Sequence, residues 1–207
     1  FYFRKDIWNL AKGFLQIDKS YSKLSYGIFF ATIPVVLIGF GFKDFFESSL
    51  IRSVDFVAYT LIAGSILIFV AEKFFSSKKD IKDLGFMQIL FIGLVQCLAL
   101  FPGMSRSGST IAAGIFAGLK KDEAARFSFL LGLPAIAGAG LLAVKDMLEA
   151  GALELGLMEL SLGFVVSFIS GFLAIDFLLK FLQTRSLTIF VILLYIKLSA
   201  LIMLIFS

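Results

Sequence analysis

The chain has 207 residues, of which 59% are hydrophobic and 16% charged, and its mean hydropathy is +0.99. In a soluble domain about one quarter of the residues are charged, so this is the composition of an integral membrane protein. The net charge of +4 is spread over the segments between apolar runs. This distribution indicates a role in setting membrane topology and in contacting lipid headgroups, and not in binding nucleic acid. The absence of histidine excludes a histidine nucleophile, base or metal ligand within this chain, and the single cysteine, Cys97, excludes an internal disulfide.

The chain begins with an apolar triplet that runs into Arg4 and Lys5, a pattern typical of the end of a transmembrane helix. We therefore expect further sequence upstream of residue 1. Crossing a bilayer takes about 20 apolar residues. The runs that approach or reach this length are 24–42, 56–71, 84–101, 127–144, 157–179 and 187–206, whereas 109–119 is too short. The sequence thus predicts an all-α polytopic membrane protein, residues 1–207 forming one membrane domain.

The runs 84–101 and 109–119 flank a short polar loop, residues 102–108. Basic residues gather in segments 1–23, 72–83, 120–126 and 180–186. These segments lie on one side of the membrane only if residues 84–119 enter and leave by the same face. We therefore predict about five transmembrane helices plus a re-entrant helical hairpin, 84–119. At 1.5 Å per residue its first arm reaches about 27 Å, so the loop is expected to open toward the extracytoplasmic side.

The loop sequence from Pro102 to Thr110 is P-G-M-S-R-S-G-S-T. Lipid cannot solvate an arginine or an open backbone, so this loop must be enclosed by protein or line a wet cavity. Arginine among hydroxyls and glycines favours phosphate or another oxyanion. The predicted ligand-contacting residues are Gln96, Gly103, Ser105, Arg106, Ser107, Gly108 and Thr110.

Each of these residues also has a structural interpretation. Arg106 could tie loop carbonyls together, and a hydroxyl could cap the second arm, with Ser109 or a neighbour as the N-cap. Gln96 could make a simple interhelix hydrogen bond. A weak echo between residues 28–34 and 128–134 favours inverted repeats, which often build a site at the membrane midplane, although chance remains an alternative in so apolar a chain.

The stretch from Gly93 to Thr110, together with residues 124–131 and Pro134, resembles the undecaprenyl-diphosphate phosphatases of the BacA type. The resemblance runs through essentially all of the chain. It implies hydrolysis of undecaprenyl diphosphate to undecaprenyl phosphate and phosphate, which recycles the lipid carrier of cell-wall synthesis. It also implies a bacterial inner membrane, bacitracin resistance on overproduction, and a divalent cation, magnesium or calcium. A homodimer is compatible with this interpretation.

The family carries a second, N-terminal motif, E-G-x-x-E-F-L-P-[VI]-S-S-T-G-H, that this chain lacks. The two motifs look like repeats of each other. By that comparison, Gln96 and Leu100 occupy the positions of the two glutamates in the N-terminal motif. Ser105, Arg106 and Ser107 occupy the positions of its S-S-T sequence. The resemblance thus assigns phosphate binding and catalysis to Arg106, and it assigns the cation ligands to a region upstream. Two rivals stay open: a transporter or lipid flippase with an anion-binding loop, and an inactive partial chain.

Overall fold

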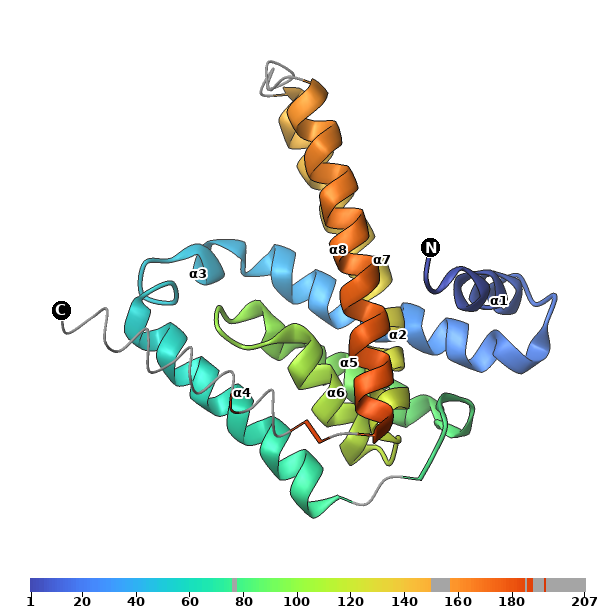
Figure 1. Cartoon of the computed structure of the whole chain (residues 1–207). Coiled ribbons are helices and arrows are strands. Elements are labelled where there is room, and N and C mark those ends of the chain that lie inside the picture. Colours follow the sequence, from blue (N-terminus) through green and yellow to red (C-terminus); the bar gives the residue numbers. More distant parts are fainter. Residues whose placement is uncertain (76–77, 150–156, 185, 188–191, 193–207) are drawn as a thin grey trace.

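Helices dominate the part of the chain that the computed structural model describes: residues 1–75, 78–149, 157–184, 186–187 and 192 (Figure 1). This part contains no named strand. The elements, in chain order, are α1 (Arg4–Phe14), α2 (Lys19–Gly41), α3 (Lys43–Glu47), α4 (Val54–Phe74), η1 (Ile81–Asp83), α5 (Phe86–Gln96), η2 (Cys97–Leu100), α6 (Arg106–Phe116), α7 (Lys121–Glu149) and α8 (Leu157–Thr184).

Four helices, α2, α4, α7 and α8, are long and apolar enough to cross a membrane, and α5 with η2 forms a shorter apolar helix. The predicted all-α polytopic membrane protein is confirmed. The predicted span 187–206 lies outside the described residues, apart from Leu187 and Ile192. Helices α1 and α3 were not predicted, because both are too short to cross a bilayer and hydropathy alone does not detect them.

The predicted hairpin is present as a pair of helices joined at one end. Its first arm is α5 followed by η2, and its second arm is α6. The Gln88 Nε2 donates to the Ala117 carbonyl over 2.7 Å, which ties the start of the first arm to the end of the second. The loop therefore lies at the opposite end from this tie. Passage of the hairpin into and out of one membrane face stays a prediction.

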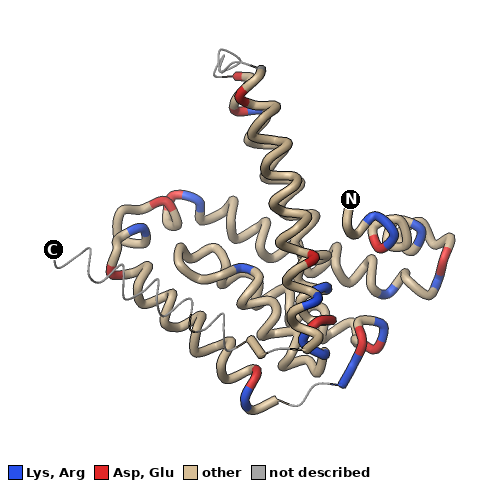
Figure 2. The backbone as a smooth tube through the Cα atoms, in the orientation of Figure 1, with Lys and Arg blue, Asp and Glu red and all other residues tan. Residues whose placement is uncertain are grey.

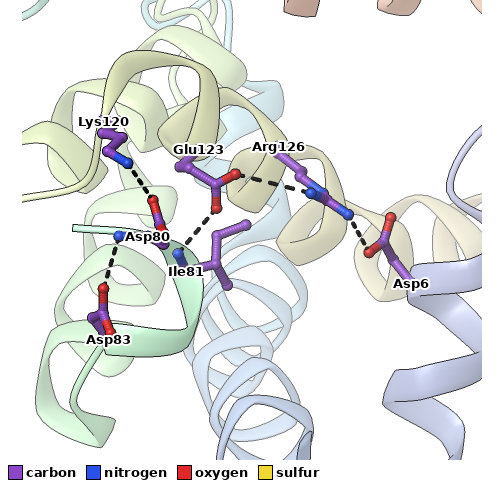
Figure 3. A network of polar contacts seen from close by, with 7 residues as sticks. All are labelled: Asp6, Asp80, Ile81, Asp83, Lys120, Glu123 and Arg126. Carbon is purple, nitrogen blue, oxygen red and sulfur yellow. Dashed lines mark hydrogen bonds and ion pairs between the residues drawn. The ribbon is translucent and has the colours of Figure 1, made fainter. Parts of the chain in front are cut away.

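The basic segments meet at the closed base of this hairpin (Figures 2 and 3). Lys120 binds Asp80 over 2.7 Å, and Arg126 binds Asp6 over 2.6 Å. The hydrogen bond to Asp80 raises the pKa of Lys120. A further ion pair joins Lys121 to Glu72 at the end of α4. The ends of α4 and α6 and the starts of α5 and α7 thus share one basic end of the molecule.

Small residues allow the helices to approach closely around the hairpin. A Cβ on Gly93 of α5 would lie 2.5 Å from the Ala31 carbonyl oxygen of α2. A Cβ on Gly108 of α6 would lie 2.8 Å from Ile68 of α4. Every residue of α6 from Gly108 to Ile115 is buried. The second arm is therefore the innermost element of the described structure, and its position is fixed by its neighbours.

We expect Gly93→Ala to lower the apparent midpoint of thermal unfolding in detergent, with a cost of about 1–3 kcal/mol. The new methyl group would meet backbone atoms of α2, which cannot rotate away. The control is Gly163→Ala in α8, where a Cβ meets nothing within 4 Å; because alanine favours helix, its midpoint should be unchanged or higher. A wild-type midpoint for Gly93→Ala would contradict this packing.

Candidate phosphate-binding site

The loop between the two arms is held against α4 at Gly103. This glycine has φ +88°, a backbone conformation that residues with a Cβ rarely adopt. A Cβ there would also lie 2.6 Å from the Val57 carbonyl oxygen of α4. The Thr60 hydroxyl of α4 donates to the Pro102 carbonyl beside it. Backbone geometry and close approach both require glycine, so Gly103 fixes where the loop turns.

Ser105 is the N-cap of α6, and its Oγ accepts a hydrogen bond from the Gly108 amide over 3.1 Å. The expectation that the second arm begins at residue 109 is wrong. Ser109 lies inside the helix and its hydroxyl donates to the Ser105 carbonyl over 2.9 Å. The polar stretch had indicated a loop, but the Ser105 cap begins the helix at Arg106. Arg106 and Ser107 thus form the first turn, where backbone amides and the helix dipole favour an anion.

Arg106 projects from this first turn against α7. Its guanidinium lies where a side chain on Gly132 would be: a Cβ on Gly132 would come within 2.7 Å of the Arg106 Cζ. The Nη1 of Arg106 is buried and has no hydrogen-bond partner among the described residues. A buried donor of a charged group that lacks a partner is costly, and an anionic ligand would offset that cost.

Gln96, the last residue of α5, is only 1% exposed. Neither its amide nitrogen nor its amide oxygen has a hydrogen-bond partner in the described part of the chain. Among the described residues, the buried side-chain nitrogen and oxygen atoms that lack a hydrogen-bond partner thus belong to Arg106 and Gln96. The sequence predicts that both residues contact a ligand. Buried polar atoms are normally satisfied, so an exception of this kind indicates a missing partner.

The remaining predicted contacts take different positions. Ser107 is half-buried in the first turn of α6. The amide of Gly108 is already bonded to Ser105, and the glycine packs on α4. Thr110 is buried one turn further along, where its hydroxyl donates to the Arg106 carbonyl over 2.9 Å and lies 2.6 Å from the Ser128 Oγ of α7. Ligand contact by these three residues stays a prediction.

The divalent cation that the resemblance implies stays a prediction. The described residues contain no group of three or more cysteine, aspartate or glutamate side chains placed to hold a metal. The loop offers hydroxyl and amide groups, whereas magnesium and calcium sites in proteins usually include carboxylates. The site as described is suited to an anion.

Three supporting residues have no expected site role from the sequence: Thr60, Ser128 and Gly132. Thr60 precedes Pro102 by 42 residues and lies on α4. Gly132 lies on α7, also far from the loop along the chain, so no sequence spacing connects either residue to the loop. The sequence feature that could have pointed to Thr60 and Ser128 is a hydroxyl group inside an apolar span, because such groups commonly form hydrogen bonds between helices.

Comparison with known proteins agrees with these motifs. Residues 1–199 match the family described as "Bacitracin resistance protein BacA". The chain belongs to this family. Proteins named undecaprenyl-diphosphatase are similar to it in Synechococcus elongatus, at 40% identity over 200 residues, and in Nostoc sp., at 41% over 199 residues. A third, from Alkaliphilus metalliredigens, is 41% identical over 176 residues.

The BacA-family chain described here is shorter than these relatives. The matches cover 92%, 92% and 85% of the chain but 69%, 62% and 64% of the respective relatives. The chain thus spans about two thirds of the length of the curated relatives it matches. The resemblance noted in the sequence is confirmed at the level of the family.

We expect Thr110 and Ser128 to be energetically coupled, because their hydroxyls form a buried hydrogen bond between α6 and α7. In a double-mutant cycle with Thr110→Val and Ser128→Ala, apparent unfolding free energies in detergent should show a coupling of about 1 kcal/mol. If the changes in unfolding free energy of the two single variants simply add up in the double variant, this hydrogen bond does not join the helices.

Proposed function

We propose that the protein hydrolyses undecaprenyl diphosphate to undecaprenyl phosphate and inorganic phosphate, recycling the lipid carrier used in cell-wall synthesis. Membership of the BacA family and relatives named undecaprenyl-diphosphatase support this reaction. The observation that carries it is the buried, unpartnered Nη1 of Arg106 at the N-terminus of a helix. Bacitracin resistance on overproduction would follow, because more of the monophosphate carrier would be regenerated.

In this reaction a water oxygen bonds to the terminal phosphorus, and the anhydride P–O bond breaks to release undecaprenyl phosphate. Negative charge on the phosphoryl group must be stabilised during the transfer. The planar fork of Arg106 can hold two phosphate oxygens, and the first-turn amides of α6 can bind another. The Ser105 and Ser107 hydroxyls and the Gln96 amide are then the candidates for the remaining phosphate hydrogen bonds.

The loop suits a substrate whose diphosphate is attached to a membrane-bound tail. α4, α7 and α8 carry many exposed large apolar side chains, which can contact the prenyl chain and lipid. Since basic segments favour the cytoplasm, the hairpin base would lie on that side of a bacterial inner membrane and the loop would open to the opposite side. The family resemblance implies that the carboxylate ligands of a magnesium or calcium ion come from sequence upstream of residue 1. A homodimer is compatible with this arrangement.

The direct test is phosphate release from undecaprenyl diphosphate by the purified protein in detergent, where no two compartments exist and transport cannot be measured. We expect Arg106→Ala and Arg106→Lys to lower kcat/KM by at least about 100-fold, the loss typical of removing one oxyanion-stabilising donor. Lysine should fail because it cannot reproduce the two-pronged contact. Absence of phosphate release by the wild type, or near-normal turnover of Arg106→Ala, would refute the proposal.

We expect Gly132→Leu to lower activity toward that of the Arg106 variants, because the new side chain would occupy the place of the guanidinium. Gly138→Leu is the matched control on the same helix, since a Cβ there meets nothing within 4 Å. Phosphate release and the unfolding midpoint are measured for both variants. Normal activity of Gly132→Leu at an unchanged midpoint would contradict the placement of Arg106 against α7.

A further inference from the structure

A second site is formed by an apolar groove on the outside of the molecule, under α1. The groove has a volume of about 370 Å³ and lies between α1, α2 and α7. Its walls are almost entirely hydrocarbon and include Ile7, Leu10, Phe14, Ile28, Phe29 and Leu133. Two of the three bordering helices, α2 and α7, are candidate membrane spans. Because α2 and α7 are candidate spans, we expect the groove to face lipid.

The groove is separate from the phosphate-binding loop. On α7 it is lined by Leu130, Leu133 and Pro134. Gly132, which contacts Arg106, is two residues from both Leu130 and Pro134 and thus on a different side of the helix. α7 itself stands between the groove and the loop, so a ligand in the groove would not be the diphosphate held by Arg106.

The free face of α1 beside the groove carries positive charge and one tryptophan. Arg4, Trp8 and Lys12 are four residues apart and share one face of the helix. Trp8 is 64% exposed, and the Lys12 Nζ lies 5.6 Å from its ring centroid. Lys5 lies three residues before Trp8 on the same side. Tryptophan with lysine and arginine is the composition that membrane interfaces favour.

The positive charge of this face is compensated only in part within the described chain. Asp6 is the acidic residue of α1, and it is bound to Arg126 of α7 over 2.6 Å (Figure 3). In the described part of the chain, no carboxylate lies within 4 Å of the charged nitrogens of Arg4, Lys5 or Lys12, although Lys12 attracts the nearby Asp18 carboxylate. The Asp6–Arg126 ion pair thus fixes α1 against α7, while Arg4 and Lys5 stay exposed and Lys12 is half-exposed.

We infer that α1 and the groove bind one anionic diacyl phospholipid of the surrounding membrane. Its phosphate contacts Lys5 and Lys12, and one acyl chain lies in the groove between α1, α2 and α7. Two observations on neighbouring faces of α1 support this ligand: a cationic face for the headgroup and an apolar groove for the chain. A neutral lipid would match only the groove, and a soluble anion would match only the cationic face. The inference does not depend on the proposed hydrolysis.

The single tryptophan of the chain makes the test specific to α1. The protein is reconstituted in two membrane samples with the same ratio of phosphatidylglycerol to phosphatidylcholine. In one sample the phosphatidylglycerol is brominated near the headgroup end of its acyl chains, and in the other sample the phosphatidylcholine is. Bromine quenches nearby tryptophan. We expect the share of the quenching due to the anionic lipid to exceed the mole fraction of that lipid in the membrane. The enrichment of the anionic lipid around Trp8 should be on the order of threefold and should fall with added salt.

Charge variants test the headgroup contact. Lys5→Gln with Lys12→Gln should remove the enrichment, whereas Lys43→Gln with Lys145→Gln, which removes the same charge elsewhere, should leave it intact. Each variant is compared with its own unquenched fluorescence, because Lys12 lies over the Trp8 ring. Enrichment that persists without Lys5 and Lys12 would overturn the headgroup assignment.

A third variant tests the groove. Ala11 lines it and is exposed, so Ala11→Phe should fill part of the groove and reduce quenching by the brominated anionic lipid. Quenching in simple proportion to mole fraction in the wild type would refute the lipid site. Absence of quenching by either brominated lipid would show that protein covers α1 and would refute it as well.

Discussion

The close packing of α6 against its neighbours is the constraint on which the candidate site depends. A polar loop with an arginine is tolerated at membrane depth where protein encloses it or where it lines a water-filled cavity. Gly93 lets α5 approach α2, and Gly108 lets α6 approach α4. Gly103 then turns the loop against α4, and the Ser105 cap begins α6 directly at Arg106. Helix packing and capping together determine where the guanidinium lies.

This enclosure is also the reason that we propose an anionic ligand. The Nη1 of Arg106 and the Gln96 amide are buried away from water, and no described residue offers either of them a hydrogen bond. The N-terminal amides of α6 add positive potential at the same place. A phosphate group would satisfy the cation, whereas a neutral ligand would leave its charge uncompensated. The basic residues elsewhere are different: Lys120 and Arg126, for example, already have carboxylate partners at the base of the hairpin.

The sequence was sufficient to predict the features that follow from composition and local pattern. Apolar runs predicted α2, α4, α7 and α8. The asymmetry of basic residues predicted that distant segments share one side of the membrane, and three of them are in contact with one another in the structure. The start of α6 was misplaced because a serine cap within a polar stretch looks like a loop until the helix is seen. Contacts between distant segments, such as Gly132 with Arg106 or Ser128 with Thr110, depend on helix packing, which one sequence does not encode in any simple spacing.

The central claim is that Arg106 holds the phosphate of a lipid diphosphate, and equilibrium binding tests it without requiring turnover. The measurement is the affinity of the purified protein for farnesyl diphosphate, a short soluble prenyl diphosphate, in wild type and Arg106→Ala. The account predicts saturable binding by the wild type and a loss of at least about tenfold in the variant, since removing a buried charged partner costs about 2–5 kcal/mol. Equal affinities, or no binding by the wild type, would contradict it.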